Sequence, residues 1–120
     1  MTAPLGRIVI YTTKLDRLAD FYARHFGFDV VRRDGDRIVE LRPAGGGATI
    51  LLHPAAQGQW QGQSLVKLVF DVEDVPAFCE AAAKRGLEFG RIHHADGYAF
   101  ANAKDPAMNS IQVSSRAFVL

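Results

Sequence analysis

Few side chains of this 120-residue chain have the type and spacing that catalysis or metal binding requires. There is no nucleophile elbow, and no Ser-His-Asp set can be argued from the spacing. His93 and His94 are neighbours in an extended segment, so their rings point to opposite faces and cannot chelate one ion. The glycines at 45–47 do not precede a helix, so they indicate a hairpin loop and not a phosphate-binding loop. Any chemistry therefore has to come chiefly from cationic, amide and aromatic side chains.

The composition indicates a globular protein of one domain. Apolar residues make up 48% and charged residues 22%, and 14 basic residues against 13 acidic ones give a net charge of +1. Neither sign forms a block, which argues against a nucleic-acid-binding protein. No segment has the pattern of a signal peptide or a membrane helix. Cys79 is the only cysteine and cannot form an internal disulfide, so we expect a cytoplasmic protein. From the charge pattern and the lack of a membrane helix, we expect neither nucleic-acid nor membrane partners.

The first half of the chain predicts a strand, a helix and three more strands. Residues 7–13 are β-branched and aromatic, which favours a strand. Apolar side chains then recur every three or four positions over residues 15–26, which predicts a helix with Thr13 as its N-cap and Gly27 as its end. Further strands are expected over residues 28–33, 37–42 and 48–53.

The second half predicts the same order of elements. A strand is expected over residues 65–72, followed by a helix that Asp74 caps and Gly86 ends. Met108 lies in a turn before the last strand and carries strain if its backbone is left-handed. The later strands are expected over residues 88–93, 98–103 and 110–115.

The two halves are predicted to be copies of one unit. Gly27 and Gly86 lie 59 residues apart, and Arg7 and Lys67 lie 60 apart. A helix on one face of each sheet leaves the other face to curve around a groove, where small ligands bind. We therefore predict an α+β fold in a single domain of residues 1–120, with module one at about 5–54, a linker at about 54–64 and module two at about 65–116.

Three segments resemble the vicinal oxygen chelate superfamily, which includes glyoxalase I, extradiol dioxygenases, fosfomycin-resistance enzymes and bleomycin-binding proteins. They are LDRLADFYARHFGF, LVFDVEDVPAF and DPAMNSIQV, and the resemblance runs from about residue 5 to residue 115. It implies two tandem βαβββ modules that form a curved, partly open eight-stranded sheet around a groove, with the helices outside. It also implies a homodimer.

Metal-dependent members of that superfamily bind their ion through His, Glu, His and Glu side chains on the first and last strands of each module. The resemblance puts these positions on Arg7, Ile50, Lys67 and Gln112. Arg and Lys have no usable lone pair at neutral pH, and Ile has none at all, so we expect no metal ion and no other cofactor. A metal-dependent glyoxalase or dioxygenase relative remains the alternative if this register is misread.

Strand alternation indicates which side chains line the groove. If Arg7 faces it, then Ile8 and Ile10 face the core, and the second module follows the same rule from Lys67 onward. Trp60, in the polar linker, is expected either to cover the ligand or to pack in a structural role. The predicted ligand-binding residues are Arg7, Val9, Tyr11, Ile50, Trp60, Lys67, Val69 and Gln112.

The two cations Arg7 and Lys67 have two interpretations. If they converge in the groove, they favour an anionic ligand such as a carboxylate, phosphate or sulfonate. Alternatively they extend to the rim, or form ion pairs with Asp71 or Glu40.

Three functions follow from these patterns. The first is a metal-free small-molecule-binding protein of the bleomycin-resistance-like branch, which holds an anionic or aromatic ligand. The second is a lyase-type or isomerase-type enzyme with Lys67 as base and Tyr11 as acid, so whether the chain is an enzyme stays open. The third is a structural or regulatory dimer module whose groove is filled by Tyr11, Ile50 and Phe100.

Overall fold

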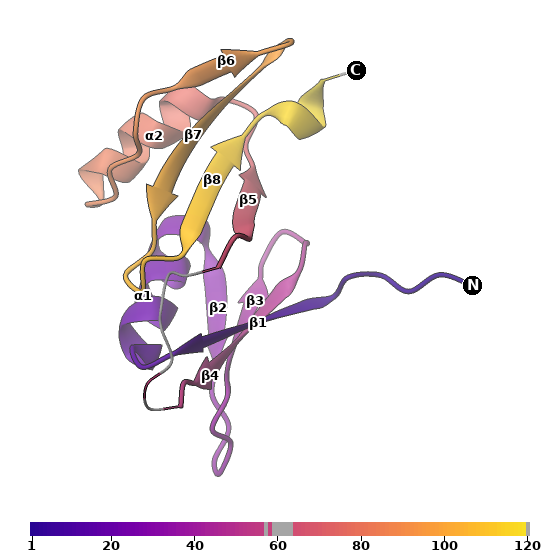
Figure 1. Cartoon of the computed structure of the whole chain (residues 1–120), viewed down its shortest axis with the longest axis vertical. Coiled ribbons are helices and arrows are strands. Elements are labelled where there is room, and N and C mark those ends of the chain that lie inside the picture. The colour runs from indigo at the N-terminus through magenta and orange to yellow at the C-terminus, as the bar shows by residue number, and fades with distance from the viewer. Residues whose placement is uncertain (57, 59–63, 120) are drawn as a thin grey trace. The chain divides into compact units, whose positions relative to one another are not determined.

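The computed structural model describes residues 1–56, 58 and 64–119 (Figure 1). The chain forms two compact units, Met1–Gln61 and Gly62–Leu120, which we name module one and module two. The described part of each unit contains four strands and one α-helix. The predicted α+β class and the two βαβββ modules are therefore confirmed. No helix among the described residues is long and apolar enough to cross a membrane.

Module one forms a single open sheet. Its strands stand in the order β1-β4-β3-β2, in which β1 and β4 run parallel and the other neighbours antiparallel. Strands β1 and β2 are thus the two edges of the sheet. The elements are β1 (Arg7–Thr12), α1 (Leu15–Phe26), β2 (Phe28–Val31), β3 (Val39–Pro43) and β4 (Thr49–Pro54).

Helix α1 buries the apolar stripe that the periodicity predicts. Leu18 and Tyr22 are fully buried, and Phe21 is buried beside them with its ring edge-on to that of Tyr22. Gly27 follows the last turn in a left-handed conformation, with φ of 73°, which an L-residue adopts only at a cost. Gly27 therefore ends the helix as predicted.

The start of α1 differs from the prediction. Lys14 and not Thr13 occupies the N-cap position, and no side chain caps the helix there. The hydroxyl of Thr12 accepts a hydrogen bond from the Lys14 backbone N–H at 2.9 Å. The expected Thr13 cap is therefore wrong, because the chain turns around Thr12 and the helix begins only at Leu15.

Module two repeats this arrangement. Its sheet has the order β5-β8-β7-β6, again with the first and last strands, β5 and β8, parallel and adjacent. The eight expected strands are thus present as two open four-stranded sheets. The elements are β5 (Lys67–Asp71), α2 (Val75–Lys84), β6 (His93–Ala95), β7 (Tyr98–Lys104), β8 (Ser110–Ser114) and a short 3-10 helix η1 (Arg116–Phe118).

Both predicted boundaries of α2 are confirmed. The Asp74 carboxylate accepts a hydrogen bond from the Ala77 backbone N–H at 3.0 Å, which satisfies one of the free donors of the first turn. Gly86 lies two residues after the last helical residue and has a φ of 95°. An L-residue there would be strained.

The strand expected over residues 88–93 is wrong in extent, because β6 begins only at His93. Residues 88–92, which precede β6, contact the sheet through a backbone hydrogen bond outside any strand pairing. The Gly90 backbone N–H donates to the Asn102 carbonyl at 2.8 Å, but residues 88–92 form no ladder with β7. Glycine weakens a strand interior, which accounts for the short β6.

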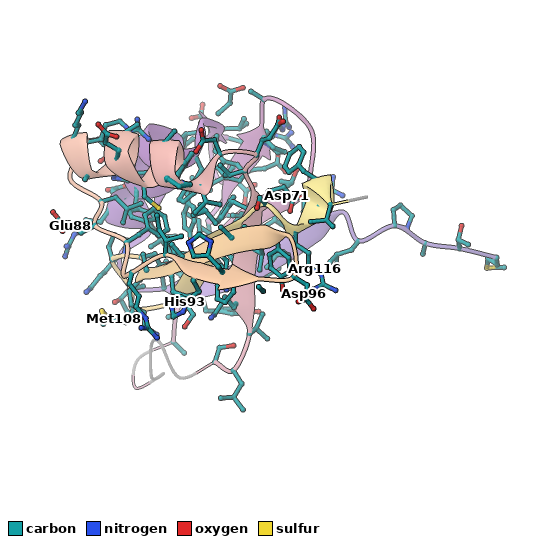
Figure 2. All side chains as sticks on the ribbon, turned by 90° about the horizontal axis from the view of Figure 1, so that it is seen from above. Asp71, Glu88, His93, Asp96, Met108 and Arg116 are labelled. Atoms are coloured by element: carbon teal, nitrogen blue, oxygen red, sulfur yellow. The ribbon has the colours of Figure 1, made fainter. Side chains whose placement is uncertain are left out.

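The turn before β8 contains the strain that the sequence predicted. Met108 has a φ of 69°, although its side chain is largely exposed and gains little from burial (Figure 2). The turn is held by Asp105, which is buried and accepts hydrogen bonds from the backbone N–H groups of Ala107 and Asn109 and from the Asn109 side chain, each at 2.9 Å. These bonds keep an L-residue in a conformation that favours glycine.

We predict that Met108→Gly stabilises the protein by about 1 kcal/mol, because glycine removes the left-handed penalty. Chemical denaturation measures the free energy of unfolding. Met108→Ala is the control: it shortens the same side chain and keeps the strained L-residue, so it should give no such gain. A Met108→Gly protein no more stable than wild type would contradict this account of the turn.

Candidate functional site

The sheet of module one has one face under α1 and one face away from it. On β1, Ile8 and Ile10 are partly buried, whereas Arg7, Val9 and Tyr11 are exposed. Because paired residues of neighbouring strands share a face, the register extends this division across the sheet. The open face of module one, as we name it, comprises Arg7, Val9, Tyr11, Asp29, Val31, Glu40, Arg42, Thr49, Leu51 and His53.

Ile50 lies on the opposite face from the one expected. It pairs with Ile8 and is only 3% exposed, so it belongs to the core beneath α1. Leu51 pairs with Val9 and with Glu40 and therefore lies on the open face. The expectation that Ile50 lines the same surface as Arg7 is wrong, and Leu51 takes that place.

This one-residue correction also brings His53 onto the open face. His53 pairs with Tyr11 across the parallel strands, and the two ring centroids are 5.0 Å apart with the planes tilted by 49°. Its Nδ1 lies 2.9 Å from the Pro54 carbonyl oxygen. His53 is absent from the predicted ligand-binding residues, because a register counted from Ile50 sends its side chain to the core side.

Glu40 on this face does not form the ion pair with Arg7 that was considered above. Glu40 accepts a hydrogen bond from the Arg42 guanidinium, two residues along the same strand. Among the described residues of module one, no side chain forms a hydrogen bond or ion pair with the Arg7 guanidinium. Glu40 is therefore paired with Arg42, and no described residue of module one pairs the positive charge of Arg7.

The open face of module two carries a polar cluster. Lys67 Nζ donates to Asn102 Oδ1 at 3.0 Å, and Gln112 Nε2 donates to the same oxygen at 2.9 Å. Three adjacent strands, β5, β7 and β8, supply these side chains, and Val69 pairs with Gln112 in the middle of the face. Lys67, Val69 and Gln112 therefore share one face, as their spacing predicts. We name Lys67, Asn102 and Gln112 the amide cluster.

Asn102 is a member of the amide cluster that is absent from the predicted ligand-binding residues. It lies in the segment 98–103, which was expected to be a strand, and its place opposite Gln112 follows only from the pairing of β7 with β8. Lys67 bonds to this amide oxygen, so the ion pair with Asp71 considered above is not the contact that it makes.

Aromatic side chains continue this face toward β6. The rings of His93 and Phe100 are stacked, with centroids 4.9 Å apart and planes 15° from parallel. Arg116, in η1, lies over the Tyr98 ring at 5.3 Å and donates to the Tyr98 hydroxyl at 3.1 Å. Figure 2 shows His93 and Arg116 in this module. The open face of module two thus joins a cationic amide cluster to flat aromatic surfaces.

The residues at the metal-binding positions that the resemblance implies do not fit a metal ion. On the corrected register these are Arg7, Leu51, Lys67 and Gln112, of which only Gln112 offers a neutral oxygen. Lys67 is held as a hydrogen-bond donor by Asn102, so it presents protons and not a lone pair. Among residues 1–56, 58 and 64–119 there is no group of three or more His, Cys, Asp or Glu side chains that could hold an ion.

The structure leaves two expected features of the groove untested, the position of Trp60 and the convergence of Arg7 with Lys67. Trp60 lies outside the described residues. Arg7 and Lys67 belong to different modules, so their convergence stays a prediction.

Cys79 lies on α2, and burial raises the pKa of its thiol, which disfavours the reactive thiolate.

Comparison with known proteins identifies the family. The model of the Glyoxalase/Bleomycin resistance protein/Dioxygenase superfamily matches residues 5–113. The chain belongs to this superfamily. No curated protein matches the chain.

Solved structures of the glyoxalase superfamily share the fold at low sequence identity. The antibiotic-binding protein TnmS3 from Streptomyces sp. CB03234 superposes with a TM-score of 0.77 at 20% identity, covering 93% of this chain and 94% of its own. A lactoylglutathione lyase from Agrobacterium tumefaciens gives 0.75 at 16% identity, covering 98% and 97%. A superfamily member from Sphaerobacter thermophilus DSM 20745 gives 0.74 at 19% identity, covering 94% and 97%. The fold thus occurs in both a binding protein and an enzyme.

We predict that Lys67 and Asn102 are energetically coupled. A double-mutant cycle with Lys67→Met and Asn102→Ala, followed by chemical denaturation, should give a coupling free energy of about 0.5 kcal/mol, because the bond joins partly exposed groups. The pair Lys84→Met and Asn102→Ala is the control, since Lys84 lies on α2 and forms an exposed ion pair with Glu80 at 3.9 Å. Additive effects for Lys67 and Asn102 would show that the amide cluster is not a stabilising unit.

Proposed function

We propose that this protein binds a small organic molecule without a metal ion, and that the ligand carries a negative charge and an aromatic or apolar body. The observation that carries the proposal is the amide cluster. Asn102 holds the Lys67 ammonium and the Gln112 amide side by side on an exposed face, and no carboxylate takes part in the cluster. A positive group fixed in this way favours an anion.

A second lysine adds to the charge of the same face. Lys104 and Lys67 both pair with Ser110, from the two sides of β8, and Lys104 Nζ donates to the Ser110 hydroxyl at 2.8 Å. Neighbouring strands are about 4.8 Å apart, so the two lysine backbones are separated by roughly 10 Å. Two lysine side chains on one face support recognition of a carboxylate, phosphate or sulfonate.

The remainder of the face suits the body of such a ligand. Val69 is half-exposed, and the stacked pair of His93 and Phe100 offers flat surface for an aromatic group. The superfamily includes proteins of this kind, since TnmS3 is an antibiotic-binding protein. The proposal includes a homodimer, which native mass spectrometry of the purified chain would detect.

The proposal predicts that 8-anilinonaphthalene-1-sulfonate, an aromatic anion, binds saturably to the folded protein. Lys67→Met should weaken this binding by about tenfold, because it removes one charge-assisted hydrogen bond. A fluorescence titration measures the affinity, and near-ultraviolet circular dichroism confirms that each variant is folded.

Lys84→Met is the matched control, because it removes the same charge from α2 and should leave the affinity unchanged. A chelator in the titration should also have no effect. Equal affinities for wild type and Lys67→Met, or binding that requires an added divalent cation, would refute the proposed function.

A further inference from the structure

We propose that the open face of module one binds an elongated aromatic anion with a hydroxyl or N–H donor at the end opposite its charge, and that His53 accepts the hydrogen bond from that donor. This inference rests on the proposed function and specifies a ligand class for a second surface. Three features in a row along β1 and β4 carry it: an imidazole acceptor, an apolar strip and a cation that no described residue of module one pairs.

The acceptor is defined by the bond that His53 makes to its own strand. Nδ1 lies 2.9 Å from the Pro54 carbonyl oxygen, and a carbonyl can only accept, so Nδ1 carries the proton. In the neutral imidazole, Nε2 then has a lone pair and is an acceptor. No described residue of module one donates to Nε2, while Tyr11 holds the ring from the neighbouring strand.

The apolar strip lies next along the same face. Val9 and Leu51 are direct partners on the paired strands, two residues before Tyr11 and His53 respectively. Val9 is 47% exposed although it is apolar. Covering these side chains with an aromatic ring would be favourable, at about 25 cal/mol for each Å² removed from water.

The cation completes the row at the start of β1. Arg7 is four residues before Tyr11, which is about 13 Å along a strand at roughly 3.3 Å per residue. Within the described residues of module one no acidic side chain pairs with Arg7, and Glu40, which is in register with Leu51, is bonded to Arg42. A carboxylate or sulfonate can therefore bond bidentately to the Arg7 guanidinium.

Two probes that differ by one hydroxyl test this arrangement. A biphenyl core holds its two para substituents at a comparable span, so the probes are 4′-hydroxybiphenyl-4-carboxylate and biphenyl-4-carboxylate. Calorimetric titration of the whole chain should show the hydroxylated probe bound about threefold to tenfold more tightly, as expected for one net hydrogen bond.

Variants assign the two ends of the probe. His53→Phe keeps a ring beside Tyr11 and should abolish the hydroxyl preference, and His53→Leu should do the same without a ring. Arg7→Met should weaken both probes by the same factor and preserve the preference. Arg17→Met, on the exposed side of α1, is the matched control and should change neither affinity.

The outcomes separate this inference from the function proposed above. A hydroxyl preference that survives both His53 variants, or failure of both probes to bind wild type, overturns the assignment to His53. The titration with 8-anilinonaphthalene-1-sulfonate and Lys67→Met reports on module two, so the proposed function stands or falls on that result alone.

Discussion

The alternation of side chains along each β-strand decides what this protein can bind. One face of each sheet lies beneath a helix, so every second residue is committed to the core and only the intervening residues can meet a ligand. A shift of one residue exchanges the two sets completely. Strand β4 shows the consequence. The observed register puts Leu51 in place of the predicted Ile50 on the open face, and it puts His53 on that face as well.

The second constraint is electrostatic. A metal site needs converging lone pairs, whereas Lys67 is held by Asn102 as a donor of protons and Leu51 provides no donor atom at all. The open face of module two presents a cation and amides instead. Correcting Ile50 to Leu51 leaves this conclusion unchanged, since both side chains are aliphatic.

More of the fold than of the candidate site could be predicted from the sequence. Gly27, Asp74 and the turn at Met108 have local signatures, and their conformations follow from them. The sequence ATILLHP has three consecutive apolar residues, so its alternation is ambiguous, and the error at Ile50 arose there. The roles of Asn102 and His53 depend on which strand lies alongside, a long-range property that no local pattern encodes.

The most direct test of this account is the metal content of the protein, measured by elemental analysis together with native mass spectrometry on freshly purified material. Cationic and aliphatic side chains in place of ion ligands predict no transition metal in stoichiometric amount, and a native mass that consists of the polypeptide alone or with an organic ligand. One Zn, Ni, Mn or Fe ion for each chain, retained through purification, would contradict it.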